Sequence, residues 1–596
     1  MTTLNLALIG NCGHSALIDR NGRFVWSCIP RIDGDPVFCS LINGEVTEDS
    51  FGFYDIDVLD FSHSEQCYIE NTAVVKTTLF DTHGASVEIM DFAPRFKQYE
   101  RTYRPIMSVR RIRAANGHPR IRVRVRPAID YGSARASTTF GSNHIRYVMP
   151  AQTLRLNTNI PVSYVLDEVP FILDEEYSLI LGPDETLNSG ISETSREFFE
   201  RTCNYWRDWS RSLSIPFEWQ EEVIRAAITL KLCAYEETGA IVAAMTTSIP
   251  EAAGSERNWD YRYCWLRDSY FVVHALNRLG ATKTMEEYIR YISNIAASVT
   301  NGHAQPVYGI AMEQELTERI EGSLSGYRDT GPVRVGNQAY QHIQNDVYGA
   351  VVMSIAQVFF DRRLAGHGDE ANFERLEQAG DQAFAVFDQP DAGLWEFRTI
   401  AKVHTFSAVM CWVACDRLAK ISKHIGKTDR ASHWQERADT IERTVHEKAW
   451  NEERNSFVES FGDGDQVDAS LLLLNELGFL AADDPKFAGT VAAVEQDLRI
   501  GDFLYRYVAR DDFGIPETSF TICTFWYISA LAALGREEEA RRLFENLLAC
   551  RNHVGLLSED VDPDSRELWG NFPQTYSMVG LISCAMRLST SWESAY

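Results

Sequence analysis

One glutamate, Glu396, lies between two aromatic residues in the segment GLWEFR, residues 393–398. A carboxyl group beside apolar rings keeps its proton more readily than one in water, because desolvation disfavours the charged form. Such a group can protonate a leaving oxygen as a general acid. The alternative is a glutamate turned out to solvent. Acid catalysis of glycosidic cleavage also requires a second carboxylate, so the segment raises the question of a partner.

The segment GLLSEDVDPDSRELWGNFPQ, residues 555–574, supplies a candidate partner. Glu559 lies between Ser558 and Asp560, and we expect this polar setting to keep it ionised as a general base. In an inverting glycosidase the base activates a water on the opposite face of the sugar, about 6.5–9.5 Å from the acid. The 84 Asp and Glu residues offer many other pairs, so composition alone does not select this one.

A third segment suits a neutral ligand with many hydroxyls. NWDYRYCWLRDS, residues 258–269, places Trp259 and three further rings beside Arg267 and Asp268. Aromatic rings stack on the apolar faces of sugars, and Asp and Arg bond sugar hydroxyls as acceptor and donor. The alternative is a structural Arg–Asp network at a junction between a loop and a helix.

The elements that must position these segments are helical. After residue 218 apolar residues recur at helical spacing. We predict twelve helices, near 220–235, 269–279, 284–298, 344–361, 372–386, 405–424, 430–450, 468–477, 485–497, 519–534, 537–549 and 574–588. Helices in pairs, without strands between them, indicate an α/α barrel of six hairpins. The long connections are 236–268, 299–343, 387–404, 498–518 and 550–573. Loops of this length are usually functional, and we expect them to build a pocket at one end of the barrel.

Residues 1–192 predict a β-sandwich instead. Asn21-Gly22 and Asn116-Gly117 each separate two apolar runs, which indicates short hairpins. Valine and isoleucine alternate with arginine along 120–126, so we expect a strand with one solvated, charged face rather than a nucleic-acid stripe. The domains expected are a sandwich over 1–192, a helical linker over 193–217 and a barrel over 218–596.

Composition narrows the classes of partner. The chain of 596 residues has a formal net charge of −27, which disfavours nucleic acid and anionic membranes. The N-terminus lacks a basic signal-peptide region, and no apolar run is long enough to span a bilayer. The 12 cysteines are scattered without a C-x-x-C pair, and we interpret Cys411 and Cys415 as buried thiols. These features favour a cytoplasmic protein, and they leave a homo-oligomer open.

The segments above, in their order along the chain, resemble glycoside hydrolase family fifteen, the glucoamylases, glucodextranases and related trehalases. Further matching segments are GHSALIDRNGRFVWSCIPRID near the start, TGAIVAAMTTSIPE at 238–251, LSGYRDTGPVRVGN at 324–337 and QNDVYG at 344–349. The resemblance is to the bacterial and archaeal branch, which implies an N-terminal β-sandwich followed by an (α/α)6 barrel. It also implies an inverting, exo-acting α-glucoside hydrolase with no metal in the reaction and no cofactor.

The resemblance assigns roles to residues. It implies Glu396 as the general acid and Glu559 as the general base. Arg267 and Asp268 would hold the 4- and 6-hydroxyls of the non-reducing glucose. The remaining expected substrate contacts are Trp259, Tyr308, Trp395, Arg398 and Trp569.

Two departures from the family pattern leave the substrate open. Ser558 stands where relatives commonly carry an acidic residue or proline, and Ala408 stands in HTFSAVM where a lysine is common. The resemblance therefore leaves a choice among maltooligosaccharide, isomaltooligosaccharide and trehalose. Two rival functions also remain, an inverting glycoside phosphorylase and a carbohydrate-binding protein that has lost the reaction.

Overall fold

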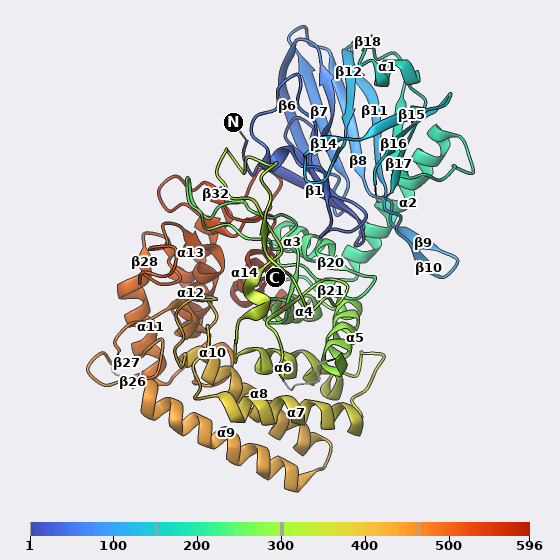
Figure 1. Ribbon diagram of the computed structural model, residues 1–596. Coiled ribbons are helices and arrows are strands. Elements are labelled where there is room, and N and C mark those ends of the chain that lie inside the picture. The colour runs from blue at the N-terminus through green and yellow to red at the C-terminus, as the bar shows by residue number, and fades with distance from the viewer. Residues whose placement is uncertain (1, 151, 299–302, 463, 596) are drawn as a thin grey trace.

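The protein is a β-sandwich followed by a helical barrel (Figure 1). The computed structural model describes residues 2–150, 152–298, 303–462 and 464–595. In Figure 1 the sandwich lies above the barrel, and helix α2, Ile191–Arg211, runs between them. The fold predicted from the sequence is confirmed.

The sandwich consists of two antiparallel sheets. The first, seven-stranded, has the order β1 (Leu6–Gly10), β2 (Ser15–Asp19), β3 (Phe24–Cys28), β5 (Phe53–Val58), β12 (Arg120–Arg126) and β18 (Phe171–Ile172), with β4 (Pro36–Phe38) paired to β3. The second, eight-stranded, has the order β15 (Ser137–Phe140), β16 (His144–Val148), β17 (Thr153–Thr158), β19 (Tyr177–Pro183), β11 (Ser108–Asn116), β8 (Ser86–Phe92), β7 (Val75–Asp81) and β6 (Phe61–Tyr68). Their inner faces share one apolar core. Helix α1 is Val162–Leu166, and the small ladders are β9 (Phe96–Gln98) with β10 (Arg101–Tyr103) and β13 (Ala128–Ile129) with β14 (Ala134–Arg135).

One of the two predicted hairpins is confirmed and the other is wrong. Strands β2 and β3 pair across Asn21-Gly22, where Gly22 has φ 76°. Strands β11 and β12 do not pair, although Asn116-Gly117 lies between them. Strand β11 is already bonded to β8 and β19 on its two edges, so no edge remains for β12. The turn therefore carries the chain from one sheet to the other.

The arginine face of β12 is paired rather than solvated. The register places Arg122 opposite Asp57 and Arg124 opposite Asp55 on β5. The guanidinium-to-carboxylate distance is 2.7 Å in both pairs, and Arg124 is buried. The expectation of a solvated face was wrong here, because the neighbouring strand carries the matching acids. This charged stripe is accounted for by ion pairs within the sandwich.

The barrel contains the twelve predicted helices in the described part of the chain. They are α3 (Gln220–Leu232), α4 (Leu266–Arg278), α5 (Thr282–Ser298), α6 (Val347–Phe360), α7 (Glu370–Val386), α8 (Thr405–His424), α9 (Thr428–Ala449), α10 (Leu473–Glu476), α11 (Pro485–Leu498), α12 (Thr521–Ala533), α13 (Glu537–Leu548) and α14 (Thr575–Leu588). The helix predicted at 468–477 is the 3-10 turn η3, Ala469–Leu472, followed by the single turn α10.

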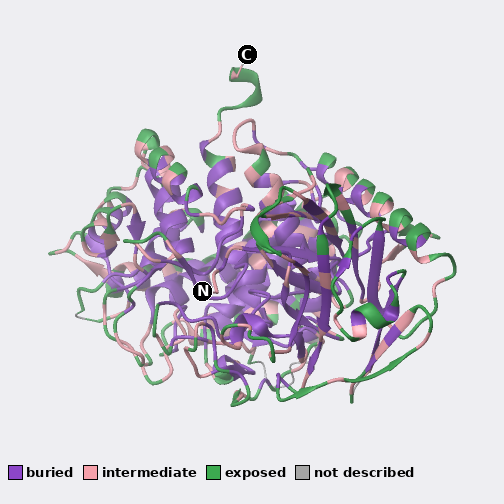
Figure 2. Cartoon of the chain, turned by 90° about the horizontal axis from the view of Figure 1, so that it is seen from above, coloured by how far each residue is buried: buried purple, intermediate pink, exposed green. Residues whose placement is uncertain are grey.

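The helices form an inner and an outer ring. Helices α4, α6, α8, α10 with η3, α12 and α14 follow one another around the inner ring, and α14 packs against α4 to close it. Inner helices such as α8 and α12 are buried on nearly every side, whereas outer helices such as α9 bury one narrow stripe. Figure 2 shows this contrast as purple central helices and green outward faces.

Short two-residue strands tie down the loops of the barrel. They are β20 (Ala234–Tyr235), β21 (Ala240–Ile241), β22 (Cys264–Trp265), β23 (Val307–Tyr308), β24 (Arg319–Ile320), β25 (Arg334–Val335), β26 (Trp450–Asn451), β27 (Ser456–Phe457), β28 (Arg499–Ile500), β29 (Phe503–Leu504), β30 (Ser519–Phe520), β31 (Asp560–Val561) and β32 (Leu568–Trp569). Two of these pairings hold segments that carry predicted site residues. Strand β22 leads directly into α4, and β31 begins directly after Glu559.

Buried polar groups join the sandwich to the barrel. Arg95 of the sandwich is fully buried and forms an ion pair with Glu236, which Lys231 also approaches at 3.2 Å. The indole of Trp26 donates to the carbonyl of Met245 at 2.8 Å. Both domains therefore share one continuous interior.

Cysteine burial agrees with the interpretation of the thiols. Cys411 and Cys415 on α8 are buried and unbonded to each other, as predicted.

Among the described residues, no helix is both long enough and apolar enough to cross a membrane.

Candidate active site

A pocket lies where the long loops meet the N-terminal ends of the inner helices. Its empty volume, including the solvent-filled mouth, is about 910 Å³. The loops before α4, α6, α8, α12 and α14 all contribute side chains. These are the five long connections predicted to gather at one end, apart from residues 299–302, which lie outside the described residues.

Glu559 lies in the pocket wall just before β31. The hydroxyl of Tyr261 donates to its Oε1 at 2.6 Å, and the backbone N–H of Asn571 lies 3.3 Å from its Oε2. Gly570, with φ 75°, leaves room for this side chain, because a Cβ there would come within 2.6 Å of the Cβ of Glu559. The loop before α4 and the loop before α14 thus fix the carboxylate from two sides.

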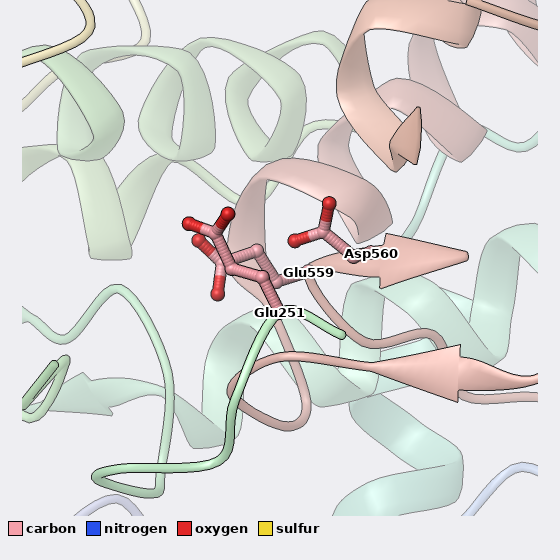
Figure 3. Close-up of side chains that lie close together, drawn as sticks. All are labelled: Glu251, Glu559 and Asp560. Carbon is pink, nitrogen blue, oxygen red and sulfur yellow. The ribbon is translucent and has the colours of Figure 1, made fainter. Parts of the chain in front are cut away.

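Two further carboxylates gather around Glu559. Glu251, Glu559 and Asp560 each place an oxygen within 4.8 Å of the others, and all three are buried (Figure 3). Arg506 donates to both oxygens of Glu251, at 3.1 and 2.5 Å. Thr518 donates to Oδ1 of Asp560 at 3.0 Å, whereas Oδ2 has no hydrogen-bond partner among the described residues.

This cluster, Glu251, Glu559 and Asp560, holds more negative charge than its one arginine neutralises. Burial, and then the charge of Glu251, raise the pKa of Glu559 well above its ordinary value, and the same causes raise the pKa of Asp560. The expectation that a polar setting keeps Glu559 ionised was therefore wrong about the setting, which is buried and crowded with acids. Three carboxylates at this spacing are also a donor set for a divalent cation, although the guanidinium of Arg506 already supplies positive charge here.

Glu396 lies in the pocket wall contributed by the loop before α8. Its backbone has φ 60°, a left-handed conformation that non-glycine residues seldom adopt and that often marks functional positions. The indole N–H of Trp265 donates to its Oε1 at 2.7 Å, and the guanidinium of Arg267 lies 3.6 Å from the same oxygen. The carboxyl group faces the pocket with 25% of the side chain exposed.

The two rings that flank Glu396 in sequence line the pocket but serve other contacts. The indole of Trp395 donates to Asp468 at 2.8 Å, and its ring lies 5.8 Å from that of Tyr507. The ring of Phe397 lies 5.5 Å from that of Tyr507. The closest polar partners of the Glu396 carboxylate instead come from the start of α4.

The inner end of the pocket is built from the first turns of α4 and α14. Nη1 of Arg267 donates to Gln344 and Asp346, both at 2.9 Å, and its Nε lies 3.8 Å from Asp268. Three buried pocket atoms have no hydrogen-bond partner among the described residues: Nε of Arg267, Oδ1 of Asp268 and the hydroxyl of Tyr576. Burial raises the pKa of Asp268 to about 7. Unpaired buried polar groups that face a cavity indicate a ligand with several hydroxyls.

The remaining predicted contacts divide into two groups. Trp259, Trp395 and Arg398 line the pocket, together with Arg267, Asp268 and both glutamates. Tyr308 and Trp569 do not line it. The hydroxyl of Tyr308 accepts from the backbone of Gln305 at 3.0 Å, and Trp569 packs against Arg328 on another face.

Several site residues were not singled out from the sequence. Tyr261 is one of the four rings in NWDYRYCWLRDS, and Glu251 ends the segment TTSIPE. Neither segment indicates that its residue lies beside Glu559 in the fold. Arg506 and Tyr576 carry no sequence signal that separates them from other arginines and tyrosines. One signal was present, since Tyr261 lies six residues before Arg267 in the same segment.

Comparisons with known proteins agree with this geometry. Residues 219–586 match the model for glycosyl hydrolases family 15, and residues 3–161 match a trehalase-like N-terminal domain. A protein named trehalase from Thermoplasma volcanium is 31% identical over 97% of this chain and 92% of its own length. A protein named trehalase from Mycobacterium tuberculosis is 30% identical over 99% of this chain and 90% of its own.

A solved structure shows the same fold. A bacterial glucoamylase in complex with acarbose superposes with a TM-score of 0.70 at 14% identity, covering 98% of this chain and 93% of the other. The match spans the sandwich as well as the barrel. Since the family model covers more than half of the chain, the protein belongs to glycosyl hydrolases family 15 and is a glycoside hydrolase.

Proposed function

We propose that this enzyme hydrolyses trehalose with inversion at the attacked carbon, using Glu396 as the general acid and Glu559 as the general base. The observation that carries the proposal is the pocket itself. Two carboxylates from different loops face one cavity, and polar atoms without hydrogen-bond partners among the described residues lie at its inner end. Hydrolysis of a glycosidic bond needs this pair of groups and a site that grips hydroxyls.

Glu396 is suited to deliver a proton to the bridging oxygen. It is the more exposed of the two carboxyl groups, and its strained backbone aims it into the cavity. The Trp265 indole fixes Oε1, which leaves Oε2 free to carry the proton. Proton transfer from a positioned acid contributes roughly 10²–10⁴-fold to the rate.

Glu559 is suited to take a proton from water. Tyr261 holds one oxygen, and Asn571 holds the other from the backbone. Tyr261 packs against Trp265, the residue that holds Glu396, with ring centroids 5.5 Å apart. Two aromatic side chains therefore connect the carboxylates, which favours the wide separation of about 6.5–9.5 Å that leaves room for water.

Arg267 and Asp268 are the proposed grip on the terminal glucose. Nε of Arg267 and Oδ1 of Asp268 form no hydrogen bond among the described residues, so they can meet a sugar hydroxyl as donor and acceptor. The adjacent hydroxyl of Tyr576 offers a further partner. A sugar that lacks the matching hydroxyl would leave these buried atoms unpaired and should bind poorly.

Trehalose is proposed over the α-1,4 and α-1,6 glucans because of the relatives. Those named trehalase align along nearly the whole chain, including the sandwich. The match of the sandwich to a trehalase-like N-terminal domain supports the same choice. Because the 12 free cysteines suit a reducing compartment, we propose the cytoplasm as the place of action.

Proton NMR of the first minutes of trehalose hydrolysis tests the proposal. Trehalose joins two α-anomeric carbons, so attack with inversion at one of them gives one β-glucose and one α-glucose. We expect equal amounts of both anomers before mutarotation mixes them. A retaining reaction would release α-glucose alone and would overturn the roles of Glu396 and Glu559.

The same assay, run with and without inorganic phosphate, tests the two rival functions. Phosphorolysis with inversion would yield β-glucose 1-phosphate and one glucose, and would require phosphate. Hydrolysis needs only water and yields two glucose molecules. A protein that binds trehalose without releasing glucose under either condition would be a binding protein, and the proposal would be wrong.

A further inference from the structure

The loop between β29 and β30 closes one side of the pocket mouth. We call residues 507–514 the strap. Tyr507, Asp511, Asp512 and Phe513 of the strap line the pocket, and Asp512 is exposed. In contrast, Asp268 and Tyr576 at the inner end are buried. A ligand that enters the pocket therefore passes the strap before it reaches the inner end.

One side of the strap is anchored to the loop that carries Trp259. Arg257 is only 5% exposed, and its guanidinium forms an ion pair with Asp511 and donates to the carbonyl of Gly514 at 3.0 Å. The hydroxyl of Tyr507 also donates to Asp511. A tight turn links the N–H of Asp511 to the carbonyl of Gly514 at 2.9 Å. These bonds fix the shape of the strap as well as its position.

The other side of the strap is anchored to the loop of the general acid. Asp512 accepts from the backbone N–H of Arg398 at 2.7 Å, two residues after Glu396, and the hydroxyl of Thr399 also donates to it. The strap thus bridges two loops that are far apart in sequence. The wall it makes is continuous from Trp259 to the acid loop.

Phe513 is the part of the strap best placed to meet a sugar. Its ring meets that of Trp259 edge to face, with centroids 5.4 Å apart. The guanidinium groups of Arg257 and Arg398 lie 5.8 and 5.6 Å from the same ring. Both cations are also paired with acids, Arg257 with Asp511 and Arg398 with Glu318, so this corner presents an aromatic surface without excess charge.

We propose that the strap sets the length of the substrate, by forming the outer wall of a subsite for one sugar beyond the cleaved bond and by excluding a third. The inner end holds the terminal sugar, the two glutamates flank the bond, and Phe513 with Trp259 closes the space beyond. The strap is joined to both neighbouring loops, so a longer glucan would have to displace it to leave through this side. The inference rests on the proposed hydrolase function but not on the choice of trehalose.

Steady-state kinetics on a series of substrates tests the strap. The substrates are trehalose, maltose, maltotriose and maltopentaose, and the variants are Phe513→Ala and Asp512→Asn, the second of which keeps the size of the side chain. We expect the wild type to cleave its best disaccharide at least about 100-fold faster, by kcat/KM, than maltopentaose, because a steric wall rejects bulk strongly. Each variant should reduce that ratio, by about tenfold or more for Phe513→Ala.

Ile515→Ala is the matched control. Ile515 is in the same loop, 57% exposed, and does not line the pocket. For Ile515→Ala the ratio of kcat/KM on the best disaccharide to kcat/KM on maltopentaose should equal that of the wild type. Thermal melting of all variants should show that they are folded. The strap is excluded as a length filter if the wild type cleaves maltopentaose as readily as its best disaccharide, or if the folded variants keep the wild-type ratio. Should maltose be cleaved and trehalose not, the choice of substrate fails while the ratio of maltose to maltopentaose still decides the inference.

Discussion

Tyr261 and Trp265 meet edge to face with ring centroids 5.5 Å apart, and each donates a hydrogen bond to a different catalytic glutamate of the proposed pair. The four-residue spacing places both donors on one short segment that leads into α4. One pair of packed rings therefore links the hydrogen bonds that hold the base and the acid. Loss of either donor should affect the reaction more than the fold.

Tyr261→Phe should lower kcat/KM for the natural substrate by roughly 10–100-fold. The reason is the loss of one hydrogen bond to a group that must become charged, worth about 1.5–3 kcal/mol. Tyr263→Phe is the control, since Tyr263 is equally aromatic and two residues away but does not line the pocket. Similar losses in both variants would mean that the segment, and not the hydrogen bond, controls the rate.

Glu396→Gln should lower kcat on trehalose by at least about 10²–10⁴-fold, because the variant cannot protonate the leaving oxygen. The same variant should lose much less activity on α-glucosyl fluoride, whose leaving group needs no proton. Kinetics on both substrates gives the comparison. Equal losses would assign Glu396 a role other than that of the general acid.

The pH dependence of kcat/KM should reflect the ionisation of Glu559 within the cluster of Glu251, Glu559 and Asp560. A base works only when ionised, and burial and then Glu251 raise the pKa of Glu559. The acid limb of the kcat/KM profile should therefore lie above the ordinary range of glutamate, with activity rising as pH increases. In Glu251→Gln the nearby negative charge is lost and Arg506 is released, so the limb should move to lower pH. A limb that stays in place would show that Glu251 does not act on the base.

Asp560→Asn should stabilise the protein, increasingly so as pH rises. The pKa of Asp560 is raised in the folded state, so the folded chain keeps a proton that the unfolded chain has released. Stability then falls as pH increases from the ordinary range of aspartate towards the folded-state pKa. Asparagine does not titrate, and it can still accept from Thr518. Thermal midpoints of both proteins at pH 5 and pH 8 should differ more at pH 8; a constant difference would contradict the prediction.

The junction between the two domains should be sensitive to Arg95. Arg95→Ala leaves the buried Glu236 without its closest cation, and removing one partner of such a pair costs about 3–5 kcal/mol. Arg211→Ala removes an exposed pair with Asp208 and should cost less than about 0.5 kcal/mol. Urea unfolding of both variants measures the contrast. Comparable small costs would mean that the junction does not depend on this pair.

Periodicity predicted most of the architecture because helices this strongly patterned depend on local sequence. The helix predicted at 405–424 coincides with α8, which is buried along most of its length. The apolar run between 468 and 477 was correctly predicted to be helical, but it forms only the 3-10 turn η3 and one α-helical turn. Propensity does not distinguish these outcomes, because the length of the segment is set by tertiary packing.

Long-range pairing was the part that local sequence could not supply. Asn116-Gly117 is a good hairpin signal, yet both edges of β11 are taken by other strands. The same holds for the site. Motifs located Glu559, but its acidic neighbour Glu251 is 308 positions earlier, and no local pattern joins the two. The setting of a catalytic group depends on which loops meet, and the fold decides that.

The closure of the inner ring by α14 against α4 has a consequence for how the enzyme is made. More than nine-tenths of the chain precedes Glu559 and α14. The first barrel helix, α3, packs against α14. Domains fold from the N-terminus during synthesis, so the sandwich can form while the barrel is still an open arc on the ribosome. Catalytic activity should therefore appear in one step, late in translation. A nascent chain would carry the general acid without a base while the 163 positions from Glu396 to Glu559 are being added.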